Sequence, residues 1–327
     1  MDAAPRSLRL RLAGGLALAL VLLAAAAATA APTAPRAKPL AFGVTTGIPD
    51  GRLARVVRIE HETGAHVSLV SWFQSFGSAL LVGRARAVLA SGRTPVVSWQ
   101  PVDQASGEPS EVRRIVAGAD DAYVEAFARA AASLPGVVWI RFAPELNGRW
   151  EPWGAGANGN TAADLVAAWR HVHAVFAAAG ATNVRWFWCP NVPGAGEASL
   201  RALYPGDDQV DVVGLDGYNF GRARPDHRWR SFAEIFGPGL GALRRLTDRP
   251  IVLGEVATVH DRGREAAWIR DFLHALDGSP AVRGFVWFDV SKHTNTRIDA
   301  TPQSVAAFRS GFRALRRGVA RGPVSAP

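Results

Sequence analysis

The sequence predicts a single-domain α/β protein with the (β/α)8 TIM-barrel fold. Eight runs of strand length are almost continuously apolar, as expected for parallel strands buried on both faces. Amphipathic runs of helix length separate them, and such alternation is typical of a barrel or of a doubly wound open sheet. The count of eight strands and the lack of a glycine-rich phosphate-binding loop in the sequence favour the barrel.

The predicted elements follow one another at regular intervals. The eight strands are expected at residues 40–46, 66–73, 94–101, 137–145, 183–191, 210–219, 249–258 and 282–290. The clearest helical patterns lie at residues 121–134, 161–180, 231–246 and 264–278. The segment after the fifth strand is short and irregular, so the helix expected there is the least well defined.

The N-terminal segment has the pattern of a secretory signal peptide. Arg6, Arg9 and Arg11 precede a long apolar run, and small residues at 28–30 form an A-x-A cleavage pattern. The alternative is an uncleaved membrane anchor. Alanine is only weakly apolar, and the cleavage pattern favours removal of the segment. We therefore expect a secreted protein, extracellular or in the cell envelope, without membrane association after cleavage.

These features divide the chain into four parts. A signal peptide occupies residues 1–30, and a proline-rich linker occupies residues 31–39. The barrel domain is expected at residues 40–318, followed by a disordered tail at residues 319–327. Since no second linker or close internal repeat occurs, one domain is expected, acting as a monomer.

Charge and cysteine content exclude several classes of partner and site. The formal net charge is +9, but the arginines are scattered along predicted helices, for example at residues 52–58 and 83–93. A nucleic-acid-binding protein usually clusters its basic residues, so no nucleic-acid partner is expected. Cys189 is the only cysteine and cannot form a disulfide within the chain. No His/Asp/Glu spacing is typical of a catalytic metal, so neither metal nor cofactor is expected.

Two carboxylates occupy matching strand ends. The functional site of a barrel lies at the C-terminal ends of its strands. Glu145 ends the fourth predicted strand and Glu255 lies near the end of the seventh. A pair of facing carboxylates can hydrolyse a glycosidic bond: one protonates the leaving oxygen, and the other attacks the anomeric carbon or activates water. A lone glutamate at a strand end often pairs with an arginine, but two at matching ends favour catalysis.

Tryptophans surround these carboxylates along the chain. Trp99, Trp150, Trp153 and Trp287 fall at strand ends or in the loop after the fourth strand. Indole faces stack on sugar rings, while the indole N–H can still reach a hydroxyl group. The alternative is core packing, which suits tryptophans inside helices and strands. It suits Trp150 and Trp153 less well, because glycine, asparagine and proline surround them.

Polar residues at the same strand ends are further candidates for sugar contacts. They are Gln100 after the third strand, Asn147 after the fourth and Asn191 after the fifth. Asp216, in the sixth predicted strand, is expected to brace its neighbours rather than to contact sugar, because it lies before the barrel mouth. The predicted partner is therefore a polysaccharide.

Four motifs together resemble glycoside hydrolase family 26, over about residues 42–308. They are RFAPELNGRWEPWG, DVVGLDGYNFG, PIVLGEVAT and GFVWFDV. The resemblance implies a retaining β-glycanase, typically a β-mannanase, while some members cleave mixed-linkage β-glucan or β-1,3-xylan. By position it implies that Glu145 is the acid/base and Glu255 the nucleophile.

The resemblance also implies roles for residues around the two glutamates. Tyr218 matches a tyrosine that hydrogen-bonds the nucleophile, and Arg141 is expected to be a further donor to it. Trp287 matches a tryptophan that floors the −1 subsite, while Trp150 and Trp153 match aromatic residues of the strand-four loop.

Two positions depart from the typical mannanase pattern. Pro144 stands where a histidine precedes the acid/base, and Gln100 stands where a histidine follows the strand-three tryptophan. The expected function is thus that of a secreted endo-β-glycanase acting on β-1,4-mannan or on mixed-linkage β-1,3-1,4-glucan. A non-catalytic carbohydrate-binding barrel and a cell-envelope transglycosylase are the alternatives.

Overall fold

The computed structural model describes residue 1 and residues 38–47, 52–103, 112–225, 227–292 and 294–324. Apart from residue 1, the predicted signal peptide lies outside the described residues, as do residues 31–37 of the predicted linker. Within the described ranges, no helix combines the length and the apolar character needed to cross a membrane.

The strands form a closed parallel barrel. They are β1 (Ala41–Thr45), β2 (Leu69–Phe76), β3 (Thr94–Asp103), β4 (Val138–Phe142), β5 (Val184–Trp188), β6 (Val212–Val213), β7 (Asp216–Asn219), β8 (Ile251–Thr258) and β9 (Val282–Phe288). β1 pairs with both β2 and β9, which closes the sheet. β6 and β7 are successive pieces of the sixth barrel strand, and both pair with β8. The predicted (β/α)8 barrel is therefore confirmed.

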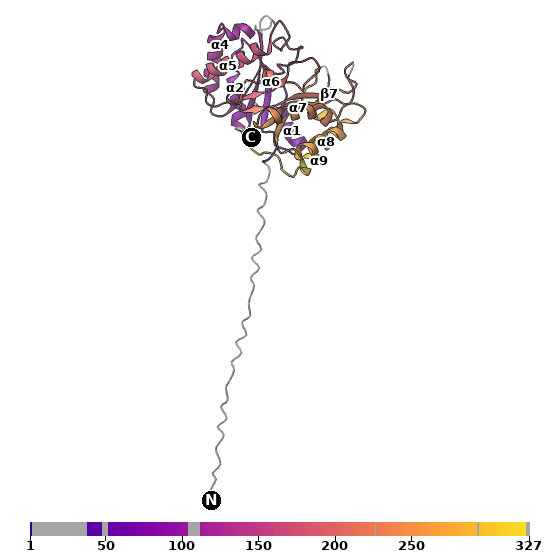
Figure 1. Ribbon diagram of the computed structural model, residues 1–327. Helices are drawn as coiled ribbons and strands as arrows, with labels where there is room; N and C mark the ends of the chain where they lie inside the picture. The colour runs from indigo at the N-terminus through magenta and orange to yellow at the C-terminus, as the bar shows by residue number, and fades with distance from the viewer. Residues whose placement is uncertain (2–37, 48–51, 104–111, 226, 293, 325–327) are drawn as a thin grey trace. The chain divides into compact units, whose positions relative to one another are not determined.

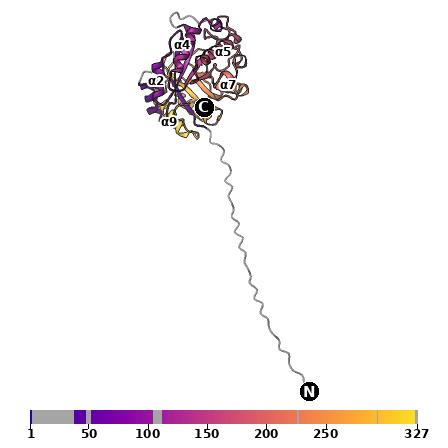
Figure 2. The same cartoon turned by 90° about the vertical axis from the view of Figure 1, so that its left-hand side faces the viewer.

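Helices cover the outside of the barrel (Figure 1). They are α1 (Ala54–Thr63), α2 (Val82–Ala90), α3 (Val112–Val116), α4 (Asp121–Ala132), α5 (Ala162–Ala178), α6 (Leu200–Leu203), α7 (Phe232–Leu246), α8 (Glu265–Asp277) and α9 (Pro302–Ala314). Capping boxes at Thr161 and Ser231 fix the starts of α5 and α7. The poorly defined helix after the fifth strand is the four-residue α6. Figure 2 shows α4 and α5 on neighbouring sides of the barrel.

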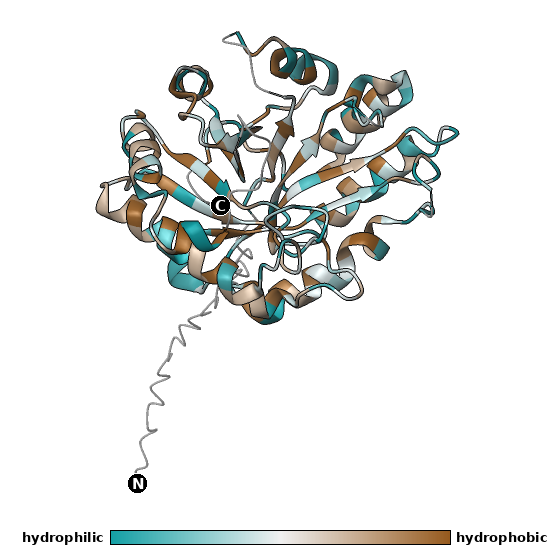
Figure 3. Cartoon of the chain, turned by 90° about the horizontal axis from the view of Figure 1, so that it is seen from above, coloured by the Kyte–Doolittle hydropathy of each residue, from teal (hydrophilic) through white to brown (hydrophobic). Residues whose placement is uncertain are grey.

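Side chains of the strands alternate between two separate cores. Each strand contributes to a core inside the barrel, which includes Leu69, Trp139 and Val286. The residues between them point outward and pack against the helices, among them Trp99 and Trp287. Figure 3 looks down on the barrel and shows polar and apolar residues alternating along the helices that surround the strands. Both faces of each strand are thus buried, as the apolar runs predict.

Part of the predicted tail packs against the base of the barrel. Val319 pairs with Leu40, and the Ala320 N–H donates to the Leu40 carbonyl at 3.0 Å. The Val324 N–H donates to Thr94 Oγ1 at 2.8 Å. The prediction of a disordered tail is therefore wrong for residues 319–324, because these backbone groups find partners on β3 and beside β1. Residues 325–327 lie outside the described part of the chain.

Candidate active site

The chain leaves β4 through an unusual backbone turn. Ala143 (φ 47°) and Glu145 (φ 54°) both adopt the left-handed conformation, on either side of Pro144. This conformation is costly for residues with a side chain, so it needs support from its surroundings. The Glu145 N–H donates to the Cys189 carbonyl at 3.1 Å, and the Trp153 indole N–H donates to the Pro144 carbonyl at 2.8 Å. These bonds fix the backbone that carries Glu145.

The turn brings Glu145 close to two other carboxylates. One carboxylate oxygen each of Glu145, Asp216 and Glu255 lie within 4.8 Å of one another. Glu145 comes from the turn after β4, Asp216 from the start of β7, and Glu255 from β8. The two glutamates that the sequence singles out therefore lie together at the barrel mouth.

Arg141 lies beneath this cluster and pairs with two of its members. Its side chain is 1% exposed, and Nη1 donates to Glu255 Oε1 at 2.6 Å and to Ser98 Oγ at 3.3 Å. Its Nη2 donates to Asp216. The Tyr218 hydroxyl donates to the other oxygen of Glu255. Both oxygens of Glu255 are thus held by donors, and the bracing role predicted for Asp216 is confirmed.

Three clustered carboxylates raise the question of a bound cation. Arg141 already supplies a positive charge to Asp216 and Glu255, and the Cys189 thiol donates to Asp216 at 3.2 Å. A metal ion bound by all three carboxylates would have to compete with this buried guanidinium. The donor set therefore suits a carboxylate pair balanced by arginine better than it suits a metal site.

Glu145 lies in a different electrostatic environment from Glu255. Burial raises the pKa of Glu145 to about 7, and the negative charge of Glu255 adds to this effect. Hydrogen bonds from Trp150 Nε1 at 2.6 Å and from Asn191 Nδ2 at 2.9 Å act in the opposite direction, as does the charge of Arg141. A carboxyl group with this pKa can donate a proton near neutral pH and recover it afterwards.

Trp150 remains open to solvent beside Glu145. Its side chain is 56% exposed although its indole N–H is bonded to the Glu145 carboxylate. A hollow of ≈ 280 Å³ adjoins it, lined by Arg149, Trp150, Ala195, Gly196 and Glu197. An exposed indole face beside the acid is suited to stacking on a sugar ring.

Three other predicted aromatic contacts are wrong, because their side chains are buried. Trp99 is fully buried and stacks on Phe127 of α4 with ring centroids 4.2 Å apart. Trp287 is 1% exposed and donates its indole N–H to the Thr296 carbonyl at 2.7 Å. Trp153 is also 1% exposed, beneath the loop after β4. In β3 and β9 the tryptophan lies on the outward face of the strand, toward the helices.

The residues that follow Trp99 and Trp287 lie on the opposite, inward face of their strands. Gln100, after Trp99, is partly exposed, and its contact with sugar stays a prediction. Phe288, after Trp287, is partly exposed and meets Tyr218 edge to face at a centroid distance of 5.6 Å. Phe73 of β2 meets Phe288 at 6.2 Å. Sequence reasoning missed both phenylalanines. Side chains two residues apart on a strand point to the same face. Val286 belongs to the interior core, so Phe288 could have been identified as inward-facing.

The two predicted asparagines differ in their accessibility. Asn147 is fully buried and donates to Glu197 Oε2 at 2.6 Å and to the Asn191 carbonyl at 3.2 Å. Its prediction as a sugar contact is therefore wrong: it braces the segment that carries Asn191. Asn191 is partly exposed and bonds Glu145 directly.

Glu151 is a further acidic residue that sequence reasoning missed. It follows Trp150 in the strand-four loop and is half-buried. Burial raises the pKa of Glu151 to about 7, with further contributions from the charges of Glu145 and Glu255. The sequence signal that could have identified Glu151 is its position one residue after Trp150, which is expected to stack on sugar.

Sequence comparisons identify one family and one curated relative. Residues 105–271 match the family model described as Glycosyl hydrolase family 26. Endoglucanase H of Acetivibrio thermocellus is 33% identical over 235 residues, which is 70% of this chain and 25% of that protein. The chain thus spans about a quarter of the length of this curated relative.

Solved structures show a similar fold at low sequence identity. The catalytic domain of a Bacillus sp. JAMB-750 endo-beta-1,4-mannanase superposes with a TM-score of 0.68 at 19% identity, covering 85% of this chain and 86% of that one. A modular endo-beta-1,4-mannanase from Cellulomonas fimi gives a TM-score of 0.66 at 18% identity, covering 87% and 72%. At such identities the likeness supports the barrel fold alone.

Proposed function

This chain belongs to glycosyl hydrolase family 26, and we propose from this premise that it is a secreted, retaining endo-β-glycanase. In this proposal Glu145 is the acid/base and Glu255 is the nucleophile. The observation that carries the proposal is the pair of facing glutamates, whose nearest oxygens lie within 4.8 Å in unlike surroundings.

The spacing of the two carboxylates supports retention of configuration. Retaining glycosidases place these groups about 5–5.5 Å apart, whereas inverting enzymes need about 6.5–9.5 Å to admit a water molecule. The nearest carboxylate oxygens of Glu145 and Glu255 lie within 4.8 Å, which is closer to the retaining spacing than to the inverting one. Direct attack by Glu255 on the anomeric carbon is the reaction that this gap favours.

The surroundings of each glutamate suit its proposed role. Glu255 accepts hydrogen bonds from Arg141 and Tyr218, which stabilise the ionised form that a nucleophile requires. Glu145, with a pKa of about 7, is protonated in mildly acidic solution and about half protonated at neutral pH. A proton donor is thus available beside the proposed nucleophile before substrate binds.

The reaction then proceeds in two steps. Glu145 gives its proton to the glycosidic oxygen as Glu255 attacks the anomeric carbon, so that the aglycone leaves and a glycosyl ester forms. Water then attacks the anomeric carbon while Glu145 takes its proton, and the ester bond to Glu255 breaks. Each step inverts the anomeric centre, so the product keeps the configuration of the substrate.

The candidate substrates are mixed-linkage β-1,3-1,4-glucan and β-1,4-mannan. The relative at 33% identity carries the name endoglucanase, whereas the mannanase structures share 18–19% identity. Pro144 offers no side-chain hydrogen-bond donor, and its carbonyl already accepts the Trp153 indole N–H. We therefore place mixed-linkage glucan first and mannan second.

Export follows from the N-terminal pattern and from the size of the substrate. Residues 1–30 have the composition of a secretory signal. A polysaccharide must be met outside the cytoplasmic membrane, so we propose that the mature enzyme acts there as a monomer.

A hydrolysis screen tests the proposed function. Purified protein is incubated with mixed-linkage glucan, mannan and β-1,3-xylan, and new reducing ends are measured. Proton NMR at early times gives the anomeric configuration of the first product, for which we expect the β form. An initial α product would contradict Glu255 as nucleophile. Binding to a polysaccharide without product would support the non-catalytic barrel, and products longer than the substrate would support the transglycosylase.

A further inference from the structure

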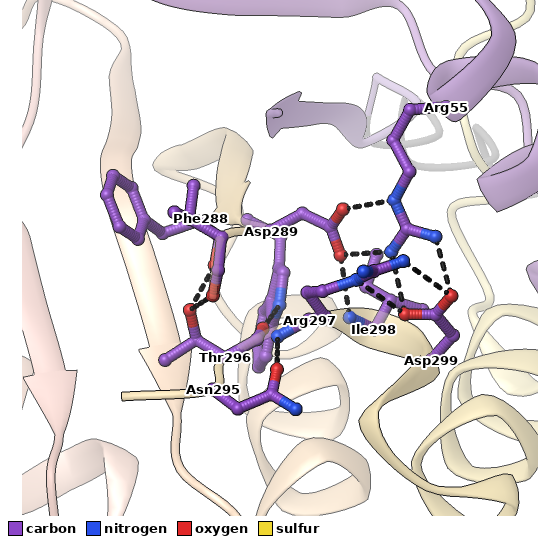
Figure 4. Close-up of polar contacts among 10 residues, drawn as sticks. Arg55, Phe288, Asp289, Asn295, Thr296, Arg297, Ile298 and Asp299 are labelled. Carbon is purple, nitrogen blue, oxygen red and sulfur yellow. Dashed lines mark hydrogen bonds and ion pairs between the residues drawn. The ribbon is translucent and has the colours of Figure 1, made fainter. Parts of the chain in front are cut away.

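An ion-pair cluster beside the barrel mouth joins the first helix to the end of the last strand (Figure 4). Arg55 donates from Nε to Asp289 Oδ2 at 2.6 Å and from Nη2 to Asp289 Oδ1 at 2.8 Å. The same guanidinium donates from Nη1 and Nη2 to Asp299 at 2.7 and 2.9 Å. We call Arg55, Asp289 and Asp299 the Arg55 clamp.

The clamp accounts for Asp289, an acid at a strand end that the proposed reaction does not use. The Asp289 side chain is fully buried, and its carboxylate faces Arg55. Its carboxylate also accepts the Ile298 N–H at 2.7 Å. A buried carboxylate held by three hydrogen bonds fixes the backbone on which it stands.

That backbone is continuous with Phe288. The Asp289 N–H donates to the Thr45 carbonyl at 2.9 Å, and the Thr296 hydroxyl donates to the Phe288 carbonyl at 2.7 Å. Thr296 is therefore bonded to the end of β9, while Asp289 and Asp299 on either side of it are both bonded to Arg55.

Phe288 in turn touches the group that holds the nucleophile. Its ring meets Tyr218 nearly perpendicularly, at an interplanar angle of 89°. The Tyr218 hydroxyl donates to Glu255. A short series of contacts thus runs from Arg55 through Asp289, Phe288 and Tyr218 to Glu255.

We propose that Arg55 is a positioning residue for the nucleophile, acting through Phe288 and Tyr218. The inference rests on the proposed role of Glu255. Without the guanidinium, Asp289 is a buried charge that retains one backbone donor, so the carboxylate turns toward water and carries the strand end with it. Phe288 then no longer confines Tyr218, and the hydrogen bond to Glu255 loses its fixed direction.

A matched control exists at the opposite end of the same helix. Arg93 Nη2 donates to Glu60 Oε2 at 2.6 Å and joins the last turns of α1 to the start of β3. This ion pair also fastens α1 to the barrel, but at the base and away from Tyr218. Arg93→Met therefore reports the cost of loosening α1 without disturbing the mouth.

A spectroscopic test works independently of catalysis. The chain has three tyrosines, so labelling with 3-fluorotyrosine gives three fluorine resonances, and Tyr218→Phe assigns one of them. We expect Arg55→Met to shift or broaden the Tyr218 resonance, Arg93→Met to leave it in place, and Arg55→Lys to have an intermediate effect. An unchanged Tyr218 resonance in Arg55→Met overturns the inference. Asp299→Asn, which weakens the clamp without burying a lone charge, replaces Arg55→Met if that variant does not fold.

Kinetics provide the second test. We expect Arg55→Met to lower kcat about tenfold or more while KM changes less than about threefold, because misplacement by about 1 Å is costly in the chemical step. In a Phe288→Leu background, Arg55→Met should lower kcat no further, since the path is already broken. Fully additive losses would contradict the path through Phe288. An inactive wild-type protein would refute the proposed function, while the fluorine spectra would still decide the inference.

Discussion

The indole N–H of Trp150 holds down the pKa of the proposed acid/base, and Trp150→Phe should reveal this. The change removes the bond to Glu145 Oε2, 2.6 Å long, but keeps an aromatic ring beside the acid. A donor to a carboxylate stabilises its charged form, so loss of the donor raises the pKa of Glu145. The first reaction step needs protonated Glu145, and the basic limb of the pH profile should therefore move to higher pH.

The magnitude follows from the geometry. A hydrogen bond to a charged acceptor contributes about 1.5–3 kcal/mol when buried. Trp150 is 56% exposed, so water takes over part of its role in the variant. If about half is recovered, the remainder is about 0.75–1.5 kcal/mol, which corresponds to about half to one pH unit. The basic limb, which we expect at about pH 7 in the wild type, should rise by that amount.

The assay is kcat/KM measured against pH on the substrate found in the hydrolysis screen, since this ratio reports the pKa values of the free enzyme. Trp268→Phe is the matched control: it removes an indole N–H on helix α8 that is bonded to the Arg230 carbonyl at 2.9 Å and not to Glu145. It should lower thermal stability and leave the limb in place. A basic limb of Trp150→Phe that stays at the wild-type position, or moves to lower pH, would refute the reasoning.

Four further predictions follow. Glu255→Gln should lower kcat at least about a thousandfold while the protein still binds polysaccharide in affinity electrophoresis, and a wild-type rate would exclude Glu255 as nucleophile. Glu151→Gln removes a negative charge near Glu145, so it should lower the pKa of Glu145 and move the basic limb to lower pH; a shift in the other direction would contradict this coupling. Trp99→Ala should destabilise the fold by about 3–5 kcal/mol in denaturant unfolding, because it empties a buried site. Trp150→Ala should instead raise KM with little change in stability. The reverse pattern would contradict the assignment of Trp99 to the core and of Trp150 to substrate binding.

The fold and the two glutamates could be predicted because their signals are local in sequence. Near-continuous apolar runs reflect strands buried on both faces, and eight of them in alternation with helices favour a barrel. Glu145 and Glu255 stand out because a charged side chain at the end of an apolar strand is costly to bury unless it is paired or has a function.

The inward or outward direction of each aromatic side chain could not be predicted in the same way. Where both faces of a strand are buried, no polar face marks the barrel interior, and an error of one residue exchanges the two cores. Trp287 is predicted to contact sugar, but its side chain is buried on the outward face of β9. Its neighbour Phe288 lies on the inward face and contacts Tyr218.

Contacts between distant segments explain the remaining differences. Asn147 is buried by residues 191–197, which approach it only in the folded chain. The order of residues 319–324 likewise depends on hydrogen bonds to Thr94 and Leu40. Such pairings leave no periodic trace in the sequence.

Arg141 and its partners all belong to barrel strands: Asp216 to β7, Glu255 to β8 and Ser98 to β3. The exposed groups beside Glu145, in contrast, stand on the loops that follow β4 and β5. The groups that hold Glu255 and the exposed groups beside Glu145 therefore belong to different parts of the chain. Mutations in the loops beyond Glu145 can accordingly change the exposed surface at the barrel mouth without altering the strand residues that hold Glu255. The barrel strands thus form a constant frame, around which the loops at the mouth can vary in sequence during evolution or protein engineering.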